Sequence, residues 1–478
     1  MRRISSIVGA ALYMGSALCA SLSGQALAAE WTAPTAVPGS REAVLSRVAI
    51  SRYDAIAVAG EPGFVAVRLH EGRWLPVRRL SGSNRLVSST DIAFDARGRL
   101  LVTWTQASGG PGEGYKGPFE IRTQTWTQAR GWGRVKVLGR SGHFILAQPR
   151  IAVDAHGDAI IAWRGLRRAG RRVLEAVSTS FRPADKGWEP MQQLPSGGPY
   201  RDVELDAQGN AYAVWTTYIG PRNYFSMRPR KSGRWGSPRR LPGSPASLPT
   251  VAATPRGAAV IAWRAAIVDS EGEGTQYGPV RAIVRSRSGR WGPVHALSRV
   301  RVHEVHGAVS PTTGAILLTW GAPPEATAHP VPGATDLRFS VFSGSEVLSP
   351  ERSAPGSAAG PLAYRPNGDA IVVFGQEALE AARPGVQGPV RLSALVPREP
   401  TFSEPVSIVA HGSYPSLAGA PTKSGPVEAA MAWYDEASKR LELSLLTLNG
   451  IEPHLASLGS GPNLAERLDG ATRTRASP

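Results

Sequence analysis

The chain has little cysteine. Its 478 residues include one, Cys19, which lies within the first 28 residues. A chain with no other thiol has no disulfide framework, no zinc site ligated by cysteine and no thiol nucleophile. We therefore expect packing, and not covalent links, to stabilise the fold.

Long apolar runs are missing beyond the N-terminus. After residue 28 no stretch approaches the ~20 apolar residues of a membrane-spanning helix, so we expect no integral membrane segment in the mature chain. The start of the chain differs, because Arg2 and Arg3 precede an apolar run that ends near the small residues Ala26 and Ala28. This order predicts a signal peptide over 1–28 and a secreted or extracytoplasmic protein.

Acidic residues are fewer than basic ones. Asp and Glu number 37 against 54 Lys and Arg, which gives a net charge of +17. A basic exported protein is attracted to acidic polysaccharides and to other anionic envelope polymers. Nucleic acid is not an expected partner, because export separates the two and no motif that reads nucleic acid is present. Hydrophobic residues make up 42% of the chain, which is enough for a core and excludes wholesale disorder.

The sequence shows no helical periodicity but has a repeat of about 54 residues. In six segments a glycine stands six residues before a large aromatic residue, and the aromatic residues are 48 to 59 positions apart. The six segments span 91–104, 150–163, 202–215, 250–263, 307–320 and 361–374. The glycines are Gly98, Gly157, Gly209, Gly257, Gly314 and Gly368, and the aromatic residues are Trp104, Trp163, Trp215, Trp263, Trp320 and Phe374.

Each unit has the pattern of four short strands. The first ends at the glycine turn, and the second is apolar on both faces, as a strand between two layers must be. A third strand follows a variable loop, as in 280–287, and a tryptophan soon followed by proline marks the fourth, as at Trp188 and Trp291. Such units repeated four to eight times predict an all-β fold, a β-propeller.

Two degenerate copies, at 47–60 and 416–433, bring the number of units to eight. We therefore expect a propeller of eight four-stranded blades over 29–457, with seven blades as the alternative if the short first unit merges with the last. A lone fourth-strand pattern at Trp31 precedes any first strand, so we expect it to pair with 441–448 and close the ring. The polar residues 458–478 predict a disordered tail.

Three of the glycine turns begin with an aspartate, Asp95, Asp154 or Asp206. Asp opening and Gly closing a turn is ordinary turn chemistry, and one carboxylate per turn is too few for calcium. No Walker loop, nucleophile elbow or dinucleotide fingerprint occurs in its required context. We expect no metal and no cofactor.

From about residue 31 to 450 this layout resembles uncharacterised propeller repeat proteins that bacteria export. It is less closely similar to the tryptophan-repeat propeller lectins and to the sialidase-like propeller superfold. The sialidase Asp-box places its aromatic residue three positions after the glycine, whereas here the spacing is six. Neither resemblance transfers a binding or catalytic residue to this chain.

Two sets of residues are candidate ligand contacts. The loops between second and third strands carry Tyr115, Tyr218 and Tyr277 shortly before Gly-Pro, with Glu113 and Glu273 near two of them. Equivalent loops emerge on one face of a propeller, so these tyrosines could form a platform for a sugar or a peptide. They also fit turns whose tyrosine packs over a blade edge.

The second set is a group of arginines in the third unit. The loop after its second strand carries five guanidinium groups, which could bind sulfate, phosphate or carboxylate. The same pattern fits a solvated, mobile loop. These residues are Arg164, Arg167, Arg168, Arg171 and Arg172.

The sequence thus favours a non-enzymatic binding protein that recognises an envelope glycan or a protein partner through one end of the ring. A sialidase-like glycoside hydrolase is the alternative, because two carboxylates from different strands can converge without any linear motif.

Overall fold

The computed structural model describes most of the chain between Ala29 and Leu448. The described residues are 29–41, 43–81, 85–108, 116–141, 148–169, 172–194, 200–217, 222–242, 246–254, 257–265, 267–268, 274–275, 279–298, 305–322, 336–343, 346–354, 359–375, 390–396, 401–402, 406–409, 412–422 and 425–448. The predicted signal peptide (1–28) and the predicted tail (458–478) lie outside them.

Within these residues the strands form eight antiparallel sheets of four or five strands each, which we number as blades 1 to 8. Blade 1 contains β3 (Val44–Ile50), β4 (Ile56–Glu61), β5 (Phe64–Arg68) and β6 (Arg78–Arg79). Blade 2 contains β7 (Arg85–Phe94), β8 (Leu100–Ser108), β9 (Lys116–Thr127), β10 (Gly131–Trp132) and β11 (Lys136–Ser141). Blade 3 contains β12 (Arg150–Val153), β13 (Ala159–Ala169), β14 (Arg172–Arg182) and β15 (Gln192–Gln193). Blade 4 contains β16 (Tyr200–Leu205), β17 (Ala211–Thr216), β18 (Asn223–Arg228) and β19 (Arg239–Arg240).

The second half of the chain repeats this order. Blade 5 contains β20 (Ala246–Ala253), β21 (Ala259–Ala265), β24 (Val280–Arg285) and β25 (Trp291–Ala296), with β22 (Ile267–Val268) and β23 (Gly274–Thr275) as a separate pair. Blade 6 contains β26 (Val305–Val309), β27 (Ala315–Ala322), β28 (Asp336–Ser343) and β29 (Glu346–Ala354). Blade 7 contains β30 (Ala359–Tyr364), β31 (Ala370–Gly375), β32 (Val390–Val396), β33 (Thr401–Phe402) and β34 (Val406–Val409). Blade 8 contains β35 (Gly412–Gly419), β36 (Val427–Asp435) and β37 (Arg440–Leu448), completed by β1 (Ala29–Trp31) and β2 (Thr35–Ala36).

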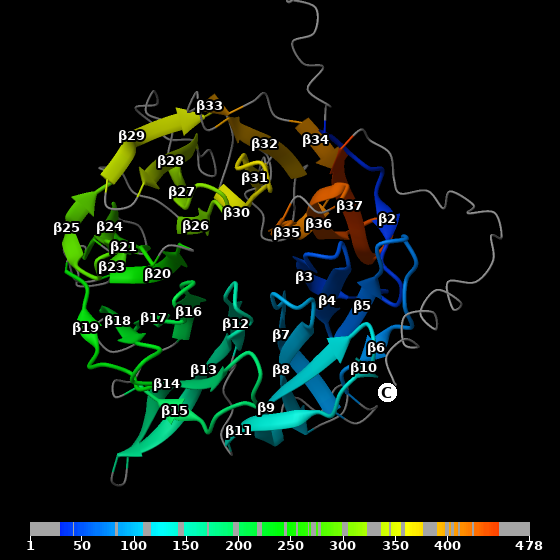
Figure 1. Cartoon of the computed structure of the whole chain (residues 1–478), viewed down its shortest axis with the longest axis horizontal. Coiled ribbons are helices and arrows are strands. Elements are labelled where there is room, and N and C mark those ends of the chain that lie inside the picture. The colour runs from blue at the N-terminus through cyan, green and yellow to red at the C-terminus, as the bar shows by residue number, and fades with distance from the viewer. Residues whose placement is uncertain are drawn as a thin grey trace, which may run out of the picture.

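The blades are arranged in a ring around one axis (Figure 1). The first strand of each blade lies innermost and contacts the first strands of both neighbours, from β3 through β7, β12, β16, β20, β26 and β30 to β35, which again contacts β3. The predicted all-β propeller is confirmed, and the eight sheets agree with the predicted eight blades.

The second strand of each blade lies between two layers, as its apolar sequence predicts. Every residue of β21 is buried, and five of the six residues of β4 and of β17 are buried as well. The repeated tryptophans on these strands fill the space between adjacent blades: Trp104, Trp215, Trp263 and Trp320 have no exposed surface. Burial of these large aromatic side chains, together with the aliphatic residues around them, stabilises the ring.

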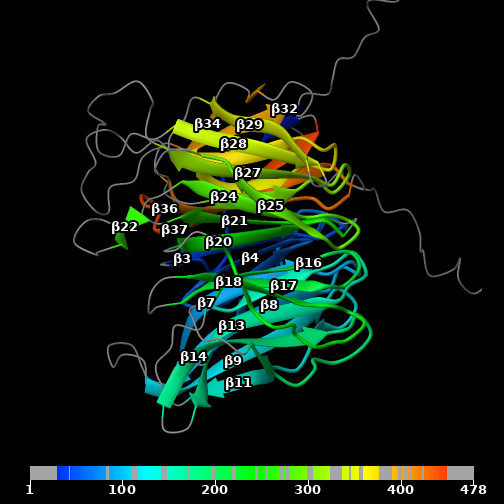
Figure 2. The same ribbon diagram turned by 90° about the vertical axis from the view of Figure 1, so that its left-hand side faces the viewer.

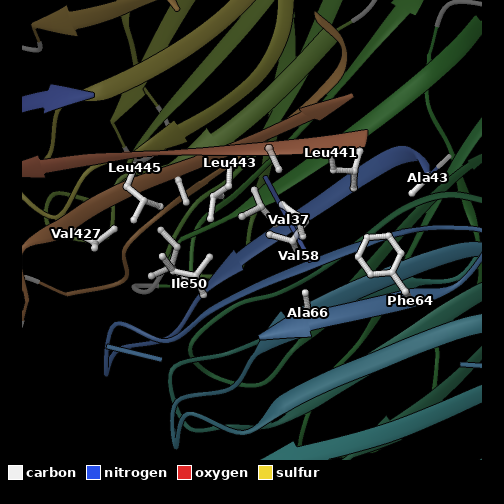
Figure 3. Packing of buried hydrophobic residues seen from close by; sticks show 14 of the residues in the cluster. Val37, Ala43, Ile50, Val58, Phe64, Ala66, Val427, Leu441, Leu443 and Leu445 are labelled. Atoms are coloured by element: carbon white, nitrogen blue, oxygen red, sulfur yellow. The ribbon is translucent and has the colours of Figure 1, made fainter. Parts of the chain in front are cut away.

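The N-terminal strands complete the last blade. Ala29 lies opposite Leu448, Trp31 opposite Leu446 and Thr35 opposite Leu443, so the predicted pairing of the Trp31 segment with 441–448 is confirmed. Figure 3 shows the buried side chains at the seam between blades 8 and 1, where Leu441, Leu443 and Leu445 pack toward blade 1. No helix among the described residues has the length and hydrophobicity needed to cross a bilayer.

Candidate functional site

The candidate residues from the sequence fall into two groups. Tyr115, Tyr218, Tyr277, Glu113 and Glu273 lie outside the described residues, so their predicted platform stays a prediction. The arginine group is described in part.

The structure corrects the predicted arginine loop. Arg164, Arg167 and Arg168 lie in β13 and Arg172 lies in β14, which pairs with β13 in continuous register as far as Ala169 opposite Arg172. Leu166, Val173 and Leu174 are the apolar residues among these charges, and Val and Leu on paired strands are compatible with a hairpin. Arg171 lies outside the described residues, and for Arg167, Arg168 and Arg172 only the backbone is described.

This hairpin extends past its own sheet. β12 pairs with β13 only as far as Ala162, and β15 pairs with β14 only at Ser178 and Thr179. The remainder, Arg164–Ala169 with Arg172–Val177, is a two-stranded projection that we call the arm. The arm and the β22–β23 pair lie at the same end of the ring, at the left of Figure 2.

A hollow of about 380 Å³, its open mouth included, lies where the arm meets blade 2. We call it the interblade hollow. It is lined by Phe119, Ile121, Gly139, Arg140, Trp163, Arg164, Gly165, Leu166, Ser178, Met191 and Gln193. Its floor is apolar, whereas its two arginines come from opposite walls, one from β11 and one from β13.

Two glycines make room for the hollow. A Cβ atom on Gly139 would come within 2.9 Å of the Trp163 ring, so the glycine lets β11 approach that side chain. A Cβ atom on Gly165 would meet Ser178 Oγ at 2.3 Å. The hollow therefore depends on residues without a side chain on both of its walls.

Ion pairs surround the hollow. Glu120 on β9 accepts hydrogen bonds from Arg140 Nε at 2.9 Å and from Arg122 Nε at 2.8 Å. Burial raises the pKa of Glu120, but these two guanidinium groups outweigh it and hold the pKa below its ordinary value. On the other wall Arg164 pairs with Glu175. Glu120 is therefore ionised at neutral pH, and the site keeps a rim of guanidinium groups.

The aspartates of the glycine turns hold the backbone. Asp154 Oδ1 accepts hydrogen bonds from the amides of His156 and Asp158, both at 2.9 Å. Asp95 and Asp206 make the same pair of bonds in their own turns. These carboxylates therefore serve as turn acceptors, the role that their spacing predicts.

A second group of charges lies on the innermost strands of blades 1 to 4, and we call it the axial cluster. Arg47 on β3 lies 3.7 Å from Asp91 on β7, which accepts a hydrogen bond from the amide of Ile151 on β12. Asp202 on β16 accepts hydrogen bonds from Thr250 Oγ1 and the Val251 amide on β20. The cluster is completed by Arg150 and Glu204.

Glu204 is the unusual member of the axial cluster. Burial, reinforced by the nearby carboxylates of Asp202 and Asp91, raises its pKa to about 8. A carboxyl group that keeps its proton at neutral pH can donate a hydrogen bond, which an ionised one cannot.

Neither the axial cluster nor the ion pair at the interblade hollow was predicted from the sequence. For Glu204 a signal exists, because the same place in the other aligned units is apolar, as in Ala93, Ala152 and Ala252. For Arg140 and Glu120 no linear signal exists. Their contact depends on the register between β11 and β9, in which Arg140 lies directly opposite Glu120.

No family model matches the chain, and no curated protein sequence matches it significantly. Solved structures do resemble it. The Dos1 propeller matches with a TM-score of 0.52 at 9% identity, over 88% of this chain and 96% of that chain. The chain has a β-propeller fold. A streptogramin B lyase (TM-score 0.40, 10% identity, 72% and 94% covered) and a Hadza microbial sialidase (0.38, 12%, 84% and 75%) are also similar, and at these identities the likeness concerns the fold alone.

Proposed function

We propose that this chain is an exported, non-enzymatic binding protein that recognises an anionic envelope glycan or an anionic protein partner through one end of its propeller. The arm carries the proposal. It holds Arg164, Arg167, Arg168 and Arg172 on two paired strands, and Arg171 follows in the connecting residues of the sequence. Guanidinium groups bind sulfate, phosphate and carboxylate in bidentate geometry, and a cluster of them attracts anions over longer distances.

Contacts within blade 3 do not explain the length of the arm. Val177 still belongs to the sheet, because its carbonyl accepts a hydrogen bond from the Leu194 amide and its side chain lies in the core of blade 3. Beyond Val177 the described strands of the hairpin pair only with each other. Several arginines close together on a projecting hairpin raise the local positive potential, which attracts an anionic ligand to this end of the ring.

Retention on a heparin resin tests the proposal. Arg167, Arg168, Arg171 and Arg172 are changed together to alanine, and the salt concentration at elution is compared with that of the parent protein. The matched control removes four exposed arginines elsewhere, Arg234, Arg239, Arg287 and Arg290. We expect the arm variant to elute at lower salt than the control. Equal elution of the two variants would contradict a role for the arm.

A glycoside hydrolase is the second candidate function, and the axial cluster favours it. Glycoside hydrolysis needs one protonated carboxyl and one ionised carboxylate. Glu204 keeps its proton because its pKa is about 8. Burial also raises the pKa of Asp202 above its ordinary value, although Arg150 and the hydrogen bonds from Thr250 and Val251 oppose that shift. Turnover of fluorogenic aryl glycosides that is lost in both Glu204→Gln and Asp202→Asn would support this function. Absence of turnover by the parent protein across such a panel counts against it.

A further inference from the structure

We infer that the interblade hollow is an anchor site for an acidic protein segment, in which one apolar side chain of the partner fills the hollow and flanking carboxylates pair with its arginine rim. This inference rests on the proposed binding function and names the class of its ligand. Three observations support it: the exposed apolar surface beside the hollow, the lack of an open aromatic face for a sugar, and the exchangeable ion pair at the rim.

Apolar side chains are exposed where the hollow opens. Met191 on its rim is 44% exposed. Leu174 lies on the same face of β14 as Ser178, four residues along the arm, and is 37% exposed. Exposed Met and Leu beside a recess are typical of a protein-binding surface, since their burial by a partner removes apolar area from water. The hollow opens to solvent, so an apolar side chain of a partner can enter it from outside.

The aromatic residues of the hollow do not offer a face for a sugar. Trp163 is 3% exposed, and Phe119 is buried as well. Sugars bind proteins by stacking on open aromatic faces, whereas an apolar side chain needs only a recess with an apolar floor. The described part of this site therefore favours a peptide side chain.

The ion pairs at the rim can exchange partners. The side chain of Arg140 is 69% exposed, and its partner Glu120 is also held by Arg122. If Arg140 turns toward a carboxylate of the partner, Glu120 keeps one guanidinium and is not left unpaired. Such an exchange avoids the cost of leaving a buried charge alone. Arg167, Arg168 and Arg172 follow along the two strands of the arm.

Fluorescence anisotropy with three labelled heptapeptides tests the inference on the unmodified protein. The first has three glutamates on each side of one phenylalanine, the second has alanine in place of phenylalanine, and the third has glutamine in place of every glutamate. We expect the first to bind at least about tenfold more tightly than either of the others, because it alone supplies both apolar burial and charge. Equal affinity for the phenylalanine and alanine peptides would overturn the anchor site.

Substitutions at the rim of the hollow test whether the peptide binds there. Met191→Glu places a charge on the rim. Its control, Val294→Glu, places a charge on an apolar residue of blade 5 that is 39% exposed. Arg140→Ala is matched by Arg97→Ala, which also removes an exposed arginine paired with a carboxylate. We expect Met191→Glu to weaken binding of the phenylalanine peptide by about tenfold. Arg140→Ala should weaken its binding at low salt, and neither control should change the affinity.

A heparin oligosaccharide in the same assay separates the two proposals. If it binds through the arm and competes with no peptide, the anchor site is wrong while the proposed binding of anions stands. If the arm variant keeps full retention on heparin while the phenylalanine peptide still depends on Met191, the anchor site stands and the arm has been misassigned. Peptide binding that persists in Met191→Glu and in Arg140→Ala would overturn the inference.

Discussion

At the scale of the residue, the repeated glycine meets a geometric need. In all six aligned units it has a positive φ, between 71° and 96°, a region that residues with a side chain rarely adopt. In three of these units a buried Asp, five residues before the next strand begins, accepts hydrogen bonds from two amides of the turn. Glycine and aspartate therefore act together to reverse the chain between the innermost strand and the second one.

The glycine requirement can be measured at Gly157. A Cβ atom there would be 3.5 Å from Ala184, an ordinary contact, so Gly157→Ala tests the left-handed backbone without a clash. We expect a loss of about 1 kcal/mol in the free energy of unfolding, measured by urea titration. Gly187→Ala is the control, because nothing lies within 4 Å of its Cβ position and its φ is ordinary. An equal effect in the two variants would contradict the role of φ.

The protonation of Glu204 makes a prediction about pH. Its pKa in the folded state is about 8, against an ordinary value of 4.5, so the folded protein holds this proton where the unfolded chain has lost it. The stability that this proton contributes is complete below about pH 4.5 and is lost as the pH rises toward 8. We expect the melting temperature to fall over this window, and to fall less in Glu204→Gln.

The groups that face Glu204 set the control for this experiment. Asp202 and Asp91 oppose its ionisation, while Arg150 and Arg47 lie on the neighbouring inner strands. Glu71→Gln removes a carboxyl of blade 1 that is paired with Arg73 instead. It should keep the pH dependence of the parent protein. A slope in Glu204→Gln equal to that of Glu71→Gln would show that Glu204 does not hold the proton.

The repeat residues were predictable from the sequence because their role is local. The glycine turn and the buried tryptophan follow from spacing alone, and even Gly60, at the tryptophan position of the first unit, has a physical reason. A Cβ atom there would lie 2.7 Å from the ring of Phe64, which fills the space instead. Arg140 and Glu120 were not predictable, because a one-residue change of register between β9 and β11 would separate them.

At the scale of the element, the pairing between β13 and β14 extends beyond the other strands of their sheet. Eleven residues of β13 pair with β14, although β12 covers only four of them. The interpretation of this segment as a loop was wrong, because its arginines, four of them in adjacent pairs, leave no alternation of apolar and polar residues that would indicate a strand. Charged residues on open strand edges also discourage pairing with other chains, so arginine suits an arm whose edges are uncovered.

Shortening the arm tests whether it serves binding or stability. Arg167–Leu174 is replaced by Asn-Gly, so that Leu166 and Glu175, which already lie opposite each other, join through a two-residue turn. We expect the melting temperature to stay within a few degrees of the parent value, since the replaced residues lie beyond Val177, which belongs to the core of blade 3. Retention on heparin should fall. A large loss of stability would show that the arm is a structural element.

At the scale of the whole molecule, the blades are joined by a recurring side-chain bond. Asp91 and Asp202 each accept a hydrogen bond from the backbone amide of the innermost strand in the next blade, at Ile151 and Val251. Ser416 does the same across the seam, where it accepts from the amide of Val48. These three acceptors occupy the same place in their units. The repeat therefore encodes contacts between blades as well as strands within them.

The last prediction concerns closure of the ring by the N-terminal strands. Deleting Glu30–Ala36 removes most of β1 and β2, which cover the edge of β37 and connect to it through Thr32. We expect a lower melting temperature and concentration-dependent association, because an uncovered strand edge pairs with other chains. A synthetic peptide of residues 29–38 added to the deletion variant should restore the melting temperature by binding to β37. A deletion variant that melts like the parent protein, with or without the peptide, would contradict closure by the N-terminal strands as a source of stability.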